Sequence, residues 1–183
     1  GHAAGGGVTT GQGNTLVGYQ SGVFTSTGHD NTFVGSVAGE GITGTRLTGD
    51  NNTCVGQAAG QKLQGAASSN TAVGKDAGGG VTTGTGNLTL GSSSGNLTVV
   101  LQTGTNNTIV GTGARTAATD TLSSVVLGYN ITGGGNNTAR IGTSTGGTVT
   151  IDLDGSDTSW AAASDSRLKK DVADSTVGLA FIK

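Results

Sequence analysis

The hydrophobic positions of this chain follow one short unit that recurs along most of its length. The unit reads Asn-Thr-x-Val-Gly, and the residues between copies are mainly polar residues and glycine. Full copies occupy residues 14–18, 31–35, 52–56, 70–74 and 107–111, and degenerate copies occupy residues 87–91, 124–128 and 137–142. Most copies begin about 17 to 21 residues after the previous one. A steady period of this length is typical of a fold built from repeats.

Each copy predicts one β-strand of about 4–5 residues, because the unit is too short for a helix and its closing glycine suits a turn. Side chains alternate along a strand, so the second and fourth residues share one face and the first and third share the other. The fourth residue is aliphatic in all seven five-residue copies, and we therefore assign Val73 and its equivalents to the core. The third residue varies from Ala72 to Phe33, which suits a less constrained wall or a subunit contact. Both Asn and Gly tolerate the backbone of tight turns.

One short strand per repeat cannot bury its own face, but stacked coils can. Three identical chains around one axis would bury more and would close the edges of each coil. The sequence therefore predicts an all-β fold: a repeat-built, trimeric parallel β-helix or β-prism, resembling a β-roll. We expect a short α segment at the C-terminus and a homotrimer as the assembled form.

Composition supports a β-repeat fibre over the other glycine-rich classes. The chain has 37 glycines, 31 threonines, no proline, and only 3% aromatic residues. Collagen needs glycine at every third position together with proline. Disorder is associated with scattered aliphatic residues and high net charge, whereas here the aliphatics are periodic and the formal net charge is −2. Because the apolar residues are mostly Ala and Val, we expect a lone subunit to be unstable.

Charge and hydropathy exclude two classes of partner. The mild acidity provides no basic surface for nucleic acid or for an anionic membrane, and no apolar stretch approaches the roughly 20 residues of a membrane-spanning helix. We therefore expect neither nucleic-acid binding nor membrane insertion. The single Cys54 excludes a disulfide within the chain.

No residue pattern predicts a metal or a cofactor. His29 lacks a second histidine, so we interpret it as a turn residue and not as a zinc ligand. The acidic residues Asp152, Asp154 and Asp157 depart from the calcium-loop spacing and lack its closing Glu, which favours a connector turn. The glycine runs match neither of the nucleotide-binding patterns, GxGxxG or GxxxxGK[ST].

Two segments resemble known families. The motif Asn-Thr-x-Val-Gly-x-x-Ala-Gly is similar to the head repeats of trimeric autotransporter adhesins, and more similar to the repeats of phage and prophage tail fibres. Residues 160–172 read WAAASDSRLKKDV and are followed by VGLAFI. This segment resembles the opening of the endosialidase-type intramolecular chaperone, also called the peptidase S74 domain. It covers about twenty residues, where that family continues for roughly a hundred more.

The second resemblance implies an autoproteolytic site. In that family the chaperone trimerises the fibre and then cuts itself off with a serine–lysine dyad, and the matching residues here are Ser164 and Lys169. A lysine with a lowered pKa can accept the serine proton so that the hydroxyl attacks a nearby carbonyl. We prefer the Ala163 carbonyl as the target, while a cut on the other side of Ser164 stays open. Activity is expected only in the full-length chaperone.

These observations divide the chain into four parts: a tag remnant and leader (1–7), a β shaft (8–142), a β connector (143–163) and the start of the chaperone (164–183). The function that they predict is a structural and host-recognition fibre of a phage virion, binding a host-surface glycan or protein receptor. The alternatives are a bacterial trimeric adhesin head, a glycan-cleaving tail spike and an ice-binding β-solenoid. The spike would need an upstream catalytic domain. Ice binding ranks last, because the T-x-T triplets are scattered.

Overall fold

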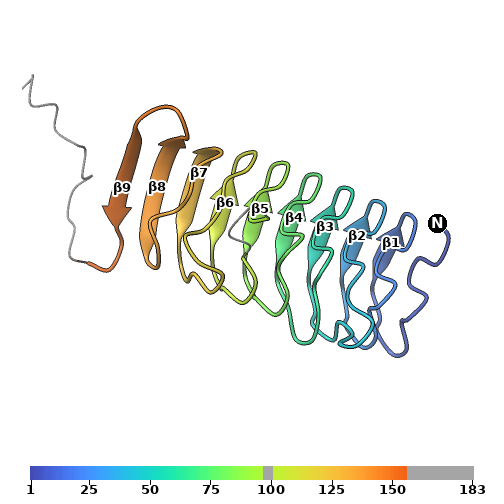
Figure 1. Ribbon diagram of the computed structural model, residues 1–183. Coiled ribbons are helices and arrows are strands. Elements are labelled where there is room, and N and C mark those ends of the chain that lie inside the picture. The colour runs from blue at the N-terminus through green and yellow to red at the C-terminus, as the bar shows by residue number, and fades with distance from the viewer. Residues whose placement is uncertain (97–100, 156–183) are drawn as a thin grey trace, which may run out of the picture.

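The computed structural model describes residues 1–96 and 101–155, and this part of the chain is entirely β-structure and turns. Nine strands form one sheet in sequence order. The strands are β1 (Thr15–Val17), β2 (Thr32–Val34), β3 (Thr53–Val55), β4 (Thr71–Val73), β5 (Leu88–Leu90), β6 (Thr108–Val110), β7 (Val125–Tyr129), β8 (Thr138–Thr143) and β9 (Thr148–Asp152). The coils stack in a row from the N-terminus to β9, as Figure 1 shows. No helix in the described residues could span a membrane.

Every strand from β1 to β7 pairs in parallel with the next strand along the chain. The register aligns the repeat with itself, because Thr15 pairs with Thr32 and Val17 pairs with Val34. The last pair differs: β8 and β9 are antiparallel and form a hairpin. The prediction of an all-β, repeat-built parallel β-helix is confirmed, with strands of three residues in β1 to β6. The expected C-terminal α segment lies outside the described residues.

The closing glycine of the unit is required by close stacking. Gly56 has a φ of +134°, and a Cβ there would lie 2.5 Å from the carbonyl oxygen of Gly74 in the next coil. No side chain fits at that distance, and a left-handed backbone is costly for other residues. In β1 to β6 the glycine therefore follows directly after the strand, and the next coil stacks directly upon it.

The interior of the solenoid is filled by the third residue of each unit. The exposed fraction is at most 3% for the side chains of Phe33, Cys54, Ala72, Thr89, Ile109 and Val126. The rest of the interior combines larger residues, Leu47, Leu63 and Leu101, with small ones, Ala38, Ala59, Ala77 and Ala114, and all are at most 1% exposed. The large ring of Phe33 packs against a glycine, because a Cβ on Gly39 would lie 2.4 Å from that ring. At Phe33 the interior is therefore narrow, and only glycine fits beside the ring at position 39.

The sequence interpretation of the two strand faces is wrong. The fourth residue points outward, and its exposed fraction is 54% in Val17, 36% in Val55 and 42% in Leu90. Side chains do alternate between the two faces of each strand, but the inward face carries the first residue of the unit, the Asn. Asn31 and Asn52 are fully buried, and alternation places the third residue on their side. The buried amide, and not the more regular aliphatic residue, therefore marks the core.

Candidate functional site

The outer face of the sheet is one candidate site. The aligned register brings the fourth residues of successive copies into one row, formed by Val17, Val34, Val55, Val73, Leu90, Val110 and Leu127. Beside it runs a second row, formed by Thr15, Thr32, Thr53, Thr71, Leu88, Thr108 and Val125. We call these two rows the outer face. Its side chains are all aliphatic or hydroxyl-bearing, so the outer face carries no charge and suits contact with another surface.

The outer face presents one continuous row of partly exposed aliphatic side chains. Single exposed aliphatic residues are common, but contiguous exposed apolar patches mark interaction sites. Here the partly exposed aliphatic row continues through seven neighbouring strands, β1 to β7. The row is therefore a candidate interface with a partner.

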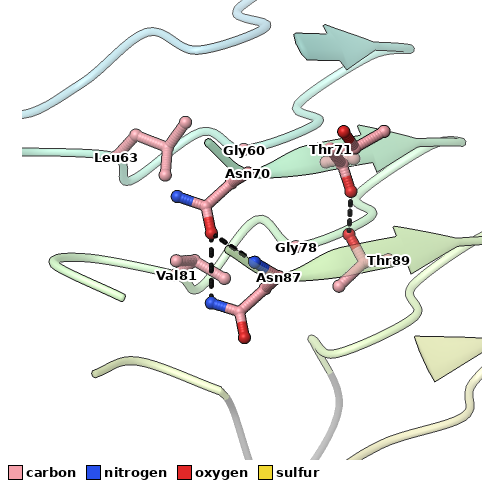
Figure 2. A pocket seen from close by; sticks show the side chains of 9 residues that line it. Gly60, Leu63, Asn70, Thr71, Gly78, Val81, Asn87 and Thr89 are labelled. Atoms are coloured by element: carbon pink, nitrogen blue, oxygen red, sulfur yellow. Dashed lines mark hydrogen bonds between the residues drawn. The ribbon is translucent and has the colours of Figure 1, made fainter. Parts of the chain in front are cut away.

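A ladder of asparagines, all buried except the partly buried Asn14, runs along the inside of the same strands. Asn70 Oδ1 accepts hydrogen bonds from the backbone N–H and from Nδ2 of Asn87, both at 3.1 Å (Figure 2). Asn70 Nδ2 donates to the carbonyl of Gly84 at 2.8 Å. The ladder includes Asn14, Asn31, Asn52, Asn70, Asn87 and Asn107 and ends at the N–H of Ser124. Sequence reasoning missed this role, although the recurrence of Asn at the first position of the unit was the available signal.

The interior beside this ladder offers no room for a ligand. A void between Leu63, Val81 and Thr89 has a volume of about 10 Å³ (Figure 2). That volume is at the lower limit for one water molecule. The ladder is therefore a structural element, and the void is not a binding site.

A larger hollow lies at the C-terminal end of the solenoid, with a volume of about 290 Å³. It is lined by Arg115, Asn130, Ile131, Thr132, Arg140, Thr143, Ser144, Gly146 and Thr148. The β8–β9 hairpin supplies one side of the hollow, and the turn after β7 supplies another. Sequence reasoning did not identify this hollow, because Arg115 lies outside the repeat unit and Arg140 lies in the degenerate, longer copy at residues 137–142.

The residues considered from the sequence as chemical groups are not brought together into a site. Ser164, Lys169 and Asp157 lie outside the described residues. His29 Nδ1 accepts a hydrogen bond from the N–H of Gln12 at 3.1 Å, in a turn. Among the described residues no group of three His, Cys, Asp or Glu side chains could hold a metal ion. Burial raises the pKa of the Cys54 thiol to about 12, which keeps it protonated and unreactive near neutral pH.

Against known protein families, curated proteins and solved structures, the chain shows no match.

Proposed function

We propose that this chain is one subunit of a homotrimeric phage fibre, in which the solenoid is the shaft. The fibre is a structural and host-recognition part of the virion, and its receptor is a glycan or protein of the host surface. The resemblance of residues 160–182 to the endosialidase-type chaperone supports a fibre, because that chaperone assembles trimeric fibres. In the full-length protein Ser164 and Lys169 act as its autoproteolytic dyad.

One observation carries the proposal: the uncharged outer face runs the length of the parallel sheet. Burying apolar surface stabilises association by about 25 cal/mol per Å², and side chains such as Val17, at 54% exposed, have such area to bury. A second copy of the chain has the same repeat, so the aliphatic residues of its outer face have the same spacing from strand to strand. Three copies arranged around one axis cover all three outer faces, which suits closed symmetry.

The alternative of a bacterial adhesin head uses the same geometry, because it is also a trimer of repeat-built subunits. The two differ in the segment on the C-terminal side of the repeats. An adhesin continues into a coiled-coil stalk and a membrane-anchoring barrel, whereas a fibre continues into the rest of the chaperone. The similarity of residues 164–169 to the chaperone motif favours the fibre, and the complete reading frame distinguishes the two.

Ice binding is favoured by one structural observation. The repeat threonines Thr15, Thr32, Thr53 and Thr71 stand in register on the outer face. The row is interrupted at Leu88 and Val125. An ice-binding face must be open to water, so this function excludes a trimer closed over the outer face. A stable monomer that lowers the freezing point without lowering the melting point would favour ice binding.

Sedimentation equilibrium of the purified chain tests the proposal. We expect three times the subunit mass of 17.6 kDa. A folded monomer that persists at micromolar concentration would contradict the fibre assignment.

A further inference from the structure

The hollow at the C-terminal end of the solenoid combines two arginines with polar side chains and has no acidic residue in its lining. We propose that it binds an oxyanion carried by a saccharide, such as the carboxylate of a uronic acid or the phosphate of a sugar phosphate. The groups that would recognise this ligand are Arg140, Arg115 and the hydroxyl and amide groups around them.

Arg140 occupies a position that is apolar in most of the other strands. It pairs in register with Val126, which is fully buried and points into the core. Arg140 Nη1 donates to the carbonyls of Thr132 at 2.9 Å and Gly133 at 3.4 Å. Its Nε is buried and has no hydrogen-bond partner in the described part of the chain. Buried donors are normally paired, so this guanidinium has hydrogen-bonding capacity that the solenoid does not use.

Arg115 is held in place beside the same hollow. Its Nη1 donates to Asn130 Oδ1 at 2.8 Å and to the Gly113 carbonyl at 3.2 Å. A guanidinium has five N–H donors in a planar fork, which matches two oxygens of a carboxylate or phosphate. The ion pair formed within the described residues joins Lys75 to Asp76, so neither arginine of the hollow is neutralised there. Two arginines without a carboxylate provide the charge that an oxyanion requires.

The remaining groups suit a sugar. The hydroxyls of Thr143, Ser144 and Thr148 line the hollow with the amide of Asn130, and these groups both donate and accept hydrogen bonds, as sugar hydroxyls require. The volume of about 290 Å³ is close to the lower end of the roughly 300–1,000 Å³ of small-molecule sites. The hollow therefore fits one acidic sugar unit and not a long oligosaccharide.

This inference deepens the proposed host-recognition role and rests on it for its biological setting. The hollow is formed by one chain, so ligand binding is measurable whether or not the trimer forms. A monomer that binds an acidic sugar would contradict the fibre proposal and support the binding site. A trimer that binds no acidic sugar would support the fibre proposal and contradict the binding site.

Isothermal titration calorimetry of the whole chain tests the ligand class, with glucuronate, glucose 6-phosphate, glucose and inorganic phosphate as probes. We expect saturable binding of one or both acidic sugars that weakens as salt is raised, because exposed charges are screened. Glucose should show no binding, and inorganic phosphate should bind more weakly than the acidic sugars. Equal binding of glucose, equal or tighter binding of phosphate, or no binding of either acidic sugar would overturn the proposal.

Substitutions locate the binding in this hollow. Arg115→Gln should weaken binding of the acidic sugar by about tenfold or more, because it removes a charged donor pair. The affinity of Arg115→Lys should lie between those of the wild type and Arg115→Gln, because lysine keeps the positive charge but lacks the planar pair of N–H donors. Thr148→Val removes an exposed hydroxyl at nearly constant shape and should weaken binding without unfolding the hairpin. The control is Arg46→Gln, an exposed arginine that donates to the Gly7 carbonyl in an early coil, and its affinity should be unchanged. Wild-type affinity in both Arg115→Gln and Thr148→Val would overturn the assignment.

Discussion

At the residue scale, the buried asparagine of each repeat fixes the register of neighbouring strands and supplies hydrogen-bond partners for buried polar groups. Asn70 accepts two hydrogen bonds from Asn87 and donates one to the Gly84 carbonyl. Each bond joins one coil to the next, and buried polar groups are stable only when they are paired in this way. A one-residue slip of any strand would break these bonds and would turn the core residues outward. The ladder therefore specifies the stacking more strictly than the small aliphatic side chains could.

Replacing one member of the ladder should be strongly destabilising. Asn70→Ala leaves the Gly84 carbonyl and the N–H of Asn87 without their partners, and each unpaired buried group costs about 1–3 kcal/mol. We expect the free energy of unfolding, measured by chemical denaturation, to fall by roughly 2–5 kcal/mol. The control is Gln57→Ala, whose side chain is exposed and whose stability should change by less than about 0.5 kcal/mol. Equal stability of the two variants would show that the ladder contributes little.

At the element scale, the repeat was sufficient to locate the strands but not to orient them. Every strand from β1 to β6 lies within a copy of the unit, and the parallel pairing follows from one short strand per coil. The inward face could not be deduced from aliphatic regularity, because the outer Val is more regular than the inner row that holds Phe33 and Ala72. The inner row varies because the residues packed against it vary in size as well. Phe33 packs against Gly39, whereas Ala72 and Thr89 lie beside Leu63 and Val81. The C-terminal hollow was not predicted, because it arises where the β8–β9 hairpin ends the repeats.

Two neighbouring substitutions in β4 separate the faces. Ala72 is 3% exposed, so Ala72→Asp buries a charge and should unfold the subunit, at a cost of several kcal/mol. Val73 is partly exposed on the outer face, so Val73→Asp should disturb the fold of the subunit less than Ala72→Asp and should weaken the proposed trimer. Circular dichroism reports folding, and sedimentation reports assembly. If Val73→Asp alone abolished the β signal, the outer face would be essential for folding of the subunit itself.

At the scale of the whole molecule, the solenoid is a linear stack. Each strand pairs only with its neighbours in sequence, so stability is approximately a sum over coils and their interfaces. The single-chain core is thin, and the outer face remains open along its length. A fibre made from such chains has to align three stacks, and a chaperone that holds three chains in register would assist that slow step.

Self-cleavage in the full-length protein is expected under this proposal. We predict a cut beside Ser164 after the trimer has formed, and Ser164→Ala and Lys169→Ala should each leave one uncut band. Lys170→Ala is the matched control and should still be cut, because Lys169 holds the motif position. Mass spectrometry of the products decides the matter. Efficient cleavage in Ser164→Ala, or a cut far from this serine, would remove the dyad assignment.

The stacking of one coil directly upon the next has a consequence for how the length of the solenoid can change by genetic exchange. Residues 5–18 read GGGVTTGQGNTLVG and residues 78–91 read GGGVTTGTGNLTLG, so the two segments end at equivalent positions of β1 and β5. Recombination between their coding sequences would delete residues 19–91 and join Gly18 to Ser92. The strands β2 to β5 would be lost, while β1 would stack on β6 with Asn14 placed above Asn107. The product would be shorter by roughly 19 Å at the usual spacing of about 4.8 Å between strands. Tandem duplication would lengthen it by the same amount, so genetic exchange could change the reach of the molecule in whole coils while every remaining strand stays in register.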